Sequence, residues 1–400
     1  MYKKKLKIGI FWEQYEYGGV DSHIKYLLEG WKNNDDTFVI YHNNNNQGLD
    51  RLKKEINKKN IVFKEIKSLF NEKKNYINFF LIPIKFFLSI LKYKKFLRNE
   101  NLDVIISQNG GYPASYGVLA ALVSAYKINV PVRILVIHHQ ATQPSFLMGI
   151  FRSFLDRLIP KIASSIICVS EATKQSLYDN TLLTLDDNTH VKVIYNCVPN
   201  FLITNQKEKI FEKKDKNLIG IIGRIEDYKG HKDLIYAFSR MPEEIKIKNR
   251  IIIIGKGKDN VVSDLKKFIK NLDIEDHVNF TGFLSNKIED IIRNLDLVVM
   301  PTRSFEGFGY AIAESMSAGT PVLSSKIGAV EEYLSLKEGG LFESGNIDDL
   351  TNNLIDFNNN KDQWIKRAEI AKKKINNNFD SVKISEQFRE HILLKYLDRN

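Results

Sequence analysis

Length, composition and charge set the first limits on this chain. Its 400 residues are 43% hydrophobic, which suffices for two or three domain cores, and they include only two cysteines. Cys168 and Cys197 both stand in apolar, strand-like contexts, which argues against a disulfide-rich secreted protein and favours a reducing cytoplasm. The formal charge of +11 is weak support for an anionic partner, because A/T-rich codons alone would produce a chain this rich in Asn, Lys and Ile.

Apolar runs alternate with helical patterns from the N-terminus onward, which predicts a parallel sheet. The run 6–12 is too short and too charged for a signal peptide, and residues 7–12 are instead predicted as the first strand. A loop with Gly18 and Gly19 follows, and then a helix over about 21–32. Further strands of this half are predicted at 37–41, 104–107, 132–137, 165–169 and 191–195.

The charged stretch 207–217 is interpreted as an exposed linker to a second half. That half begins with a strand at 218–222 and continues with strands at 251–254, 278–280, 297–300 and 321–324. The sequence therefore predicts an α/β protein with two Rossmann-like domains, residues 1–199 and 200–380, followed by a terminal segment, 381–400.

One string in the second half carries the most chemistry. Strand 297–300 ends at Pro301 and leads into Glu306-Gly307-Phe308-Gly309, and the helix that follows holds Glu314. Ligands of parallel sheets lie beyond the carboxyl ends of the strands, glycines allow unusual backbone dihedrals, and a helix start attracts anions. Two carboxylates eight positions apart, one in the loop and one in the helix, suit a polyhydroxylated diphosphate such as a nucleotide-sugar. Either glutamate alone is better explained as a solvated side chain, and only the whole string favours the ligand.

The string 306–314 resembles the Glu-x7-Glu signature of the retaining glycosyltransferases of family four, and the likeness is densest over 218–334. The resemblance implies the GT-B fold, in which two Rossmann-like parallel-sheet domains face a central cleft. The first domain would bind the acceptor and the second the nucleotide-sugar. The last helix, here 384–396, would cross back to the first domain, at a point left open because 379–384 lacks the family's usual tryptophan.

The resemblance also assigns roles to the string. The first glutamate of the signature, here Glu306, lies at the donor sugar in that family. The second, here Glu314, binds the ribose hydroxyls of the nucleotide. Loop amides around Gly307, Phe308 and Gly309 contact the sugar and the phosphate.

Two cations follow the strand 218–222. Gly223-Arg224 comes directly after it, and Lys229 lies further along the same loop. An arginine binds a phosphate through two parallel bonds, whereas a lysine acts as a point charge. The resemblance makes Arg224 and Lys229 catalytic, because the family's matching cations hold the donor pyrophosphate and stabilise the departing nucleotide. A solvated basic turn is the alternative.

Three further clusters belong to the predicted donor site. Gly255-Lys256-Gly257 lacks the third glycine of a dinucleotide fingerprint and is interpreted as a sharp turn near the nucleotide. Phe280-Thr281-Gly282 resembles the family's Phe-x-Gly, whose following residues often pair with the base. The run 328–332 resembles the loop beyond the donor site, although its two glutamates are equally explained as charges at a helix start.

The first half is less specific. Gly18 and Gly19 could approach the donor phosphates or the acceptor, or could form a plain turn. His138 and His139 end a buried strand, and in the family a histidine there contacts the donor sugar. The sequence does not decide whether His138 or His139 matches that histidine. Ser170 is predicted as a helix cap rather than a catalytic serine.

No Asp-x-Asp and no metal-ligand spacing of His and Cys occurs in the sequence, so neither a metal nor another cofactor is expected. Charge on the leaving nucleotide would be balanced by Arg224, Lys229 and helix dipoles. The predicted enzyme is thus a retaining, metal-independent hexosyltransferase that uses a nucleotide-sugar and a saccharide acceptor, with a lipid-linked acceptor or a surface polysaccharide precursor favoured and no nucleic acid partner. A nucleotide-sugar epimerase of the same fold and a non-catalytic nucleotide-sugar-binding subunit are the alternatives.

The segment 76–98 raises the question of a membrane. It is apolar from 77 to 91 but contains Pro83 and Lys85, and it falls short of the roughly 20 residues that cross a bilayer. Lys85, Ser89 and Lys92 would form a narrow polar stripe beside a broad apolar surface that includes Phe86 and Phe87. The segment predicts either a helix lying on an anionic cytoplasmic membrane face or a helix buried in the core.

Overall fold

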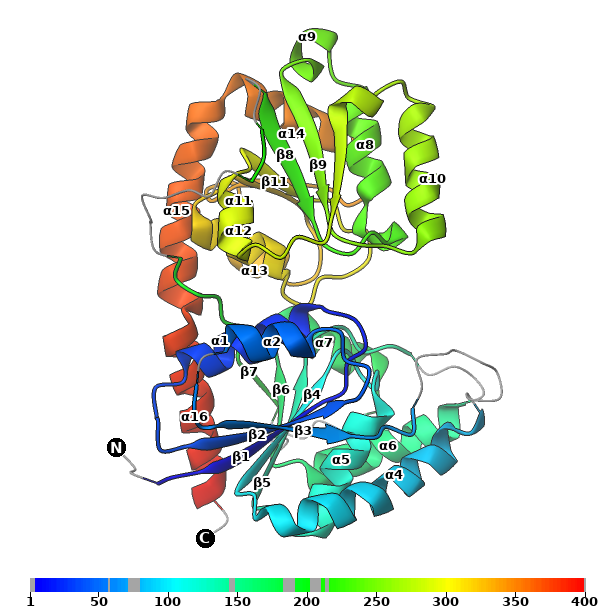
Figure 1. Ribbon diagram of the computed structural model, residues 1–400, viewed down its shortest axis with the longest axis vertical. Coiled ribbons are helices and arrows are strands. Elements are labelled where there is room, and N and C mark those ends of the chain that lie inside the picture. The colour runs from blue at the N-terminus through cyan, green and yellow to red at the C-terminus, as the bar shows by residue number, and fades with distance from the viewer. Residues whose placement is uncertain are drawn as a thin grey trace. The chain divides into compact units, whose positions relative to one another are not determined.

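The computed structural model describes residues 4–56, 58–70, 80–143, 148–182, 191–201, 210–212 and 216–398. The chain forms two units, each an α/β structure (Figure 1). The first combines Met1–Cys197 with Ser381–Asn400, and the second is Val198–Asp380. The sequence predicts these boundaries after residues 199 and 380.

The first unit is built on a parallel sheet of seven described strands in the order β3-β2-β1-β4-β5-β6-β7. Most of its central strands are buried along their whole length, as expected for a sheet covered on both faces. The strands are β1 (Lys7–Trp12), β2 (Thr37–Asn43), β3 (Ile61–Ile66), β4 (Val104–Asn109), β5 (Val132–Ile137), β6 (Ser165–Cys168) and β7 (Val191–Val193).

Helices cover both faces of this sheet (Figure 1). On one face α4 (Ile82–Leu97), α5 (Tyr116–Lys127) and α6 (Gly149–Ile162) share the hydrophobic core. The other helices of the unit are α1 (Gly19–Gly30), α2 (Leu49–Glu55), α7 (Glu171–Asn180) and the C-terminal α16 (Ser381–Leu397).

Helix α16 packs closely against α1. A Cβ atom at Gly30 would lie 2.1 Å from the Ser381 carbonyl oxygen, so the contact requires glycine. The Ser385 hydroxyl donates to the Leu27 carbonyl at 2.8 Å, and Arg389 Nε donates to the buried Asp36 carboxylate at 2.7 Å. The end of the chain is therefore an integral layer of the first unit.

The second unit has six described parallel strands in the order β10-β9-β8-β11-β12-β13. They are β8 (Asn217–Ile222), β9 (Asn249–Ile254), β10 (Val278–Gly282), β11 (Leu297–Met300), β12 (Val322–Ser325) and β13 (Gly340–Phe342). Its helices are α8 (His231–Ser239), α9 (Glu243–Lys246), α10 (Asp259–Lys270), α11 (Ile288–Arg293), α12 (Tyr310–Ala318), α13 (Val330–Tyr333), α14 (Ile347–Asn359) and α15 (Lys361–Phe379).

Both sheets change winding direction at one place, which is the point where open α/β sheets bind ligands. In the first unit this switch point lies between β1 and β4, and in the second between β8 and β11. The loops that leave β8 and β11 carry Arg224, Lys229 and Glu306. The predicted fold class, two Rossmann-like parallel sheets, is confirmed.

Some local predictions need correction. Strands β3 and β13 were not predicted, and both are edge strands, which lack the continuous apolar run of central ones. Helix α1 begins at Gly19 and ends at Gly30, two residues before the predicted bounds at each end. Ser170 accepts a hydrogen bond from the Thr173 amide at 3.1 Å and is the predicted N-cap.

Residues 76–79 of the predicted apolar segment lie outside the described residues. In α4 the hydroxyl-bearing Ser89 is fully buried, so the predicted polar stripe is wrong at that position. Phe86 is buried too, because this side of the helix packs into the core that α4 shares with α5 and α6. Among the helices described, none combines the length and the apolar character that a membrane crossing needs.

Candidate functional site

The Glu306 carboxylate lies at the switch point of the second unit. Glu306 is 8% exposed, and its Oε1 atom accepts a hydrogen bond from the buried Thr302 hydroxyl at 2.8 Å. The Lys229 ammonium forms an ion pair with the same oxygen. One hydroxyl and one cation thus fix the carboxylate at the carboxyl edge of the sheet.

The Glu306 backbone is held by the loop after β12. The Ala329 amide donates to the Glu306 carbonyl oxygen at 2.9 Å. Gly328 has a φ of +54°, and a Cβ atom there would lie 2.2 Å from the same oxygen. Only glycine permits so close an approach of two backbones. The run 328–332 therefore has a structural part in holding the Glu306 loop.

The loop after β8, residues 223–230, carries Arg224 and Lys229 and is called the cation loop. It packs closely against the loop after β11. Gly230 has a φ of +74°, and a Cβ atom there would lie 1.8 Å from the Pro301 carbonyl oxygen. The Arg303 amide donates to the Tyr228 carbonyl at 2.7 Å, and the Arg303 guanidinium forms a two-bond ion pair with Asp233. This packing is what brings Lys229 to Glu306.

Arg224 occupies the start of the same loop, with 44% of its side chain exposed. Its Nη1 atom lies 3.0 Å from Glu226 Oε1, and its Nη2 donates to the Tyr228 hydroxyl at 3.2 Å. The guanidinium is therefore oriented by two neighbours on its own loop while part of it remains exposed to solvent.

Glycines end the three strands on one side of the switch point. Gly223, Gly255 and Gly282 follow or close β8, β9 and β10, all with positive φ. The Gly255 amide donates to the Gly282 carbonyl at 2.9 Å, and a Cβ atom on Gly255 would lie 1.8 Å from the Gly223 carbonyl oxygen. Gly257 is similarly tight, with its Cβ position 2.6 Å from the Ile225 carbonyl oxygen. These glycines therefore let the loops after β8, β9 and β10 pack backbone against backbone.

Helix α12 carries the second glutamate of the signature. Gly309 caps its start with a φ of +81° and Gly319 caps its end with a φ of +79°. The unusual backbone dihedral expected in this loop is thus present at Gly309, whereas Gly307 does not have a positive φ. Glu314 lies in the middle of this helix and is 5% exposed. No acidic residue stands in the first turn, so the positive end of the helix dipole is uncompensated there.

Two predicted donor-binding residues serve the core with their side chains. The Phe308 ring is buried among aromatic rings, including those of Tyr310 and Tyr333, so only its backbone is placed to meet a ligand. Phe280 packs against the core of the second unit, with the Lys266 ammonium 5.4 Å from its ring centroid.

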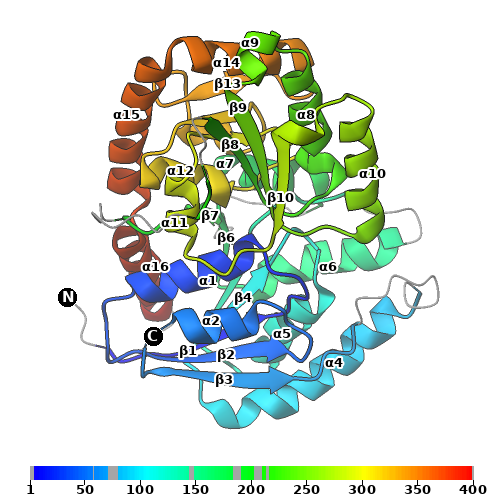
Figure 2. The ribbon, with the colours of Figure 1, turned by 45° about the horizontal axis from the view of Figure 1, so that its top comes forward.

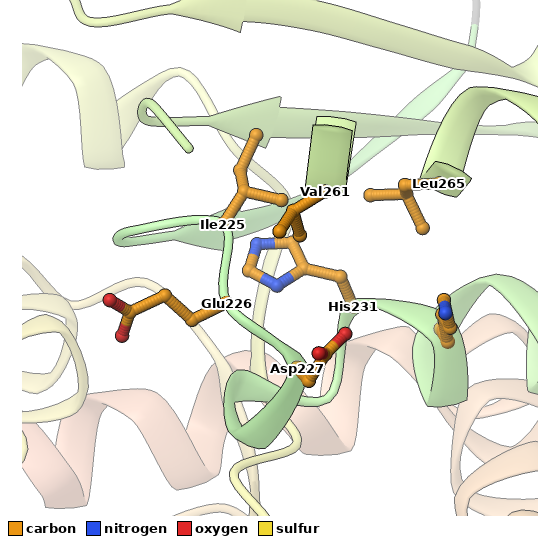
Figure 3. A pocket seen from close by; sticks show the side chains of 7 residues that line it. Ile225, Glu226, Asp227, His231, Val261 and Leu265 are labelled. Carbon is orange, nitrogen blue, oxygen red and sulfur yellow. The ribbon is translucent and has the colours of Figure 1, made fainter. Parts of the chain in front are cut away.

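A small pocket lies behind the cation loop (Figure 3). His231, at the start of α8, points into it and is 4% exposed. Burial lowers the pKa of His231 to about 4, so the ring is neutral at pH 7. The pocket is lined by Ile225, Glu226, Asp227, His231, Lys232, Val261 and Leu265.

The switch point of the first unit holds a residue that the sequence reasoning missed. Glu13 follows β1 directly, and its Oε2 accepts a hydrogen bond from the Ser115 hydroxyl at 2.5 Å. Ser115 also caps α5, and a Cβ atom at Gly117 would lie 2.0 Å from the same oxygen. Burial raises the pKa of Glu13. The available signal was its position as the first charged residue beyond the first strand.

The predicted glycines of the first unit frame the start of α1. The Gly18 amide donates to Asp21 Oδ2 at 2.7 Å, and Gly19 is the exposed first residue of the helix. Burial raises the pKa of Asp21 to about 7. The Gly18 amide is therefore engaged by a side chain of its own helix.

The two predicted histidines have different surroundings. His138 is buried, with Nε2 2.7 Å from Gln108 Oε1 and its ring centroid 4.6 Å from that of His23. Burial lowers the pKa of His138 well below its usual value and that of His23 to about 4. His139 is half-buried. Across the described parts of both units, no group of three or more His, Cys, Asp or Glu side chains is placed to hold a metal ion.

Comparison with known proteins matches both halves of the chain. Residues 17–199 match the model for glycosyltransferase family 4, and residues 203–377 match the model for group 1 glycosyl transferases. N-acetyl-alpha-D-glucosaminyl L-malate synthase of Bacillus anthracis is 23% identical over 226 residues, which are 55% of this chain and 58% of that protein. The match to this relative thus covers less than two thirds of its length.

A longer match is to N-acetylgalactosamine-N,N'-diacetylbacillosaminyl-diphospho-undecaprenol 4-alpha-N-acetylgalactosaminyltransferase of Campylobacter jejuni, 26% identical over 331 residues, 78% of this chain and 83% of that one. Among solved structures, Anabaena HepE in complex with UDP-glucose has a TM-score of 0.76 and 19% identity, covering 97% of this chain and all of its own. A glycosyltransferase from Rickettsia africae has a TM-score of 0.77 and 20% identity, with full coverage of both chains. The chain belongs to the glycosyltransferases of family four and has their GT-B fold.

Proposed function

We propose that this protein transfers a hexose-type sugar from a nucleotide-sugar to a saccharide acceptor, with retention at the anomeric carbon and without a metal. The observation that carries the proposal is the Lys229–Glu306 ion pair at the switch point of the second sheet, with Arg224 on the same loop as Lys229. A cation and a carboxylate held side by side suit a ligand that is anionic at one end and hydroxylated at the other.

Binding of the donor would redistribute these contacts. The diphosphate would accept hydrogen bonds from Arg224 and Lys229, and the sugar hydroxyls would donate to Glu306. Glu314 would accept from the ribose, and backbone amides near Gly309 would face the phosphate. A UDP-hexose is the first donor to test, because Anabaena HepE, of the same fold, is known in complex with UDP and with UDP-glucose.

In the transfer step, the acceptor hydroxyl oxygen bonds to the anomeric carbon on the face from which the diphosphate oxygen leaves. The acceptor proton passes to that departing phosphate oxygen, so charge and atoms balance. Arg224 and Lys229 stabilise the charge that builds on the leaving group. The absence of Asp-x-Asp from the sequence motivates a mechanism without a metal.

For the acceptor we favour a lipid-linked saccharide at the cytoplasmic face of a membrane. The support is the Campylobacter jejuni relative, whose name specifies a diphospho-undecaprenol acceptor and which matches over 83% of its length. A surface polysaccharide precursor without a lipid is the competing acceptor class.

A panel of nucleotide-sugars tests the proposal. Purified protein is incubated with each donor, with and without saccharide acceptors, and both nucleotide release and the anomeric configuration of the product are measured. We expect nucleotide release that depends on an acceptor, and a product with the donor's configuration. Conversion of the donor sugar without an acceptor would instead identify an epimerase, and tight binding with no turnover on any acceptor would identify a non-catalytic subunit.

A further inference from the structure

Two helices of the first unit turn large apolar side chains outward. Leu91 on α4 is 67% exposed and Ile150 on α6 is 92% exposed. We define the α4–α6 surface by its six exposed apolar residues, Ile84, Phe87, Leu88, Leu91, Ile150 and Phe154. An apolar patch that spans two helices marks an interaction site on a soluble protein.

The α4–α6 surface is continuous. The Phe87 and Phe154 rings, one from each helix, have centroids 6.1 Å apart. Beneath them, Phe86 and Phe151 pack edge to face at 5.4 Å. The two helices lie on the same side of the sheet in both views (Figures 1 and 2).

The core of the unit does not need these side chains. The inner face of α4 supplies Phe86, Ile90, Tyr93 and Leu97, all at most 5% exposed. The Ser124 hydroxyl of α5 donates to the Ile90 carbonyl at 3.0 Å and secures the helix. The outward apolar side chains are therefore additional to those that anchor α4.

Basic residues continue both apolar stripes at helical spacing. Ile84, Leu88 and Leu91 are followed by Lys95, and Ile150 and Phe154 are followed by Arg157 and Lys161. All charged residues of α4 are lysines. The acidic residue of α6, Asp156, is buried and paired with Arg152 at 2.7 Å. The charges that the two helices present outward are all positive.

We propose that the α4–α6 surface binds an anionic lipid membrane, with the apolar residues inserted among the headgroups and the basic residues on lipid phosphates. An amphipathic helix with a cationic border partitions to such an interface. A second copy of the chain fits less well, because a symmetric contact would set these like charges against one another. This role goes beyond sugar transfer and does not depend on it.

The surface also has a defined place in the unit. Helices α4 and α6 each connect parallel strands, so both run back from the carboxyl end of the sheet, and their apolar first turns lie toward the end where Glu13 and His138 stand. If the proposed function holds, a lipid-linked acceptor would reach the protein from this end.

Vesicle flotation tests the proposal with purified full-length protein. Vesicles of phosphatidylcholine alone are compared with vesicles that also contain phosphatidylglycerol. We expect the wild type to bind the anionic vesicles at least about tenfold more tightly, and to lose that preference at high salt. Phe87→Ser with Leu91→Ser should weaken binding by about tenfold or more. The matched control is Ile247→Ser with Leu336→Ser, which changes two similarly exposed apolar residues of the second unit.

The charge requirement is tested separately. Lys95→Glu with Lys161→Glu should remove the preference for anionic vesicles, whereas nucleotide affinity should stay at the wild-type value in every variant and so report correct folding. Failure of the wild type to bind anionic vesicles at low salt would overturn the proposal. So would full binding by the Phe87 and Leu91 variant, or a wild-type dimer that this variant dissociates in the absence of lipid.

Discussion

The two switch points share a topology but treat charge in opposite ways. In the second unit, Lys229 and Glu306 form an ion pair, and Arg224 stands half-exposed on the same loop. In the first unit, burial raises the pKa of Glu13 and lowers that of His138, so that both are driven toward their neutral forms. One parallel-sheet edge thus holds a cation paired with a carboxylate, and the other holds groups whose burial favours the neutral form.

The two edges differ in whether a buried charged group meets a group of opposite charge. Loops packed backbone to backbone at Gly230 and Gly328 bring cation and carboxylate together, and a paired charge tolerates burial. At the first edge the Glu13 carboxylate meets a serine hydroxyl, and His138 meets an amide oxygen and a second imidazole. A buried group without an opposite charge shifts its pKa instead. Under the proposed function, the second unit's edge would receive the diphosphate of the donor.

Removing a cation from the edge of the second unit's sheet should have the largest effect on turnover. Arg224→Ala should cut turnover by about a hundredfold or more, because the departing nucleotide loses a partner for its charge. The measurement is kcat at saturating donor and acceptor. Arg240→Ala is the matched control, since Arg240 is an equally exposed arginine of the same unit that pairs with Asp348. Equal turnover in both variants would remove Arg224 from the mechanism.

The second expected effect concerns the ribose. Glu314→Gln should weaken donor binding roughly ten- to a hundredfold, about 1.5 to 3 kcal/mol, because a charge-assisted hydrogen bond becomes a neutral one. Calorimetry with the nucleotide measures it. A 2′-deoxy nucleotide sharpens the test, since the substitution and the missing hydroxyl should be non-additive if they meet. Wild-type affinity in the variant would rule out the assigned role.

Low pH should destabilise the first unit through its buried histidines. The pKa of His23 is about 4 in the folded chain against about 6.5 when exposed, so the unfolded state binds more protons between these values. Stability should therefore fall as the pH drops from about 6.5 toward 4, with roughly 1 to 2 kcal/mol from His23 at pH 5. Denaturant unfolding at pH 7.5 and pH 5 checks this. The free energy of unfolding of the His23→Gln variant should change less between these two pH values than that of the wild type. An equal change in both proteins would contradict a buried, neutral His23.

The last prediction is that a chelator leaves turnover unchanged. If the cations of the second edge suffice for the leaving group, turnover should be the same in excess EDTA as in buffer. Loss of activity in the chelator, restored by magnesium or manganese, would show that charge compensation at this edge is incomplete without a metal.

The sequence alone was sufficient for the fold class and for the loops of the second edge. The central strand β11 is a continuous apolar run and β5 is apolar except for Arg133, and the predicted bounds of both are those observed. The pairing of Lys229 with Glu306 follows from topology, because β8 and β11 are neighbours and their loops leave the same edge.

Other features depend on contacts that no local pattern records. The consecutive polar residues Lys64 and Glu65 of β3 are compatible with its place at a sheet edge, and the contact of Glu13 with Ser115 follows only once β1 and β4 are known to be neighbours. The outward face of α4 has the same kind of residues as its inward face, so the sequence left membrane and core as alternatives. The close approach of Gly328 to Glu306 joins residues 22 positions apart, and the resemblance of the run 328–332 to a family loop does not show this contact.

The return of α16 to the first unit has a consequence for how the molecule is made. The second unit is one uninterrupted stretch, complete as soon as residue 380 has been synthesised, whereas the first unit needs Ser381 and beyond. Until Arg389 emerges, Asp36 lacks a guanidinium partner in the interior, and the α1 surface around Gly30 stays uncovered. Although domains generally fold in the order of synthesis, the first unit here needs residues that are made after the whole second unit, so a stop codon before residue 389 should destabilise the first unit.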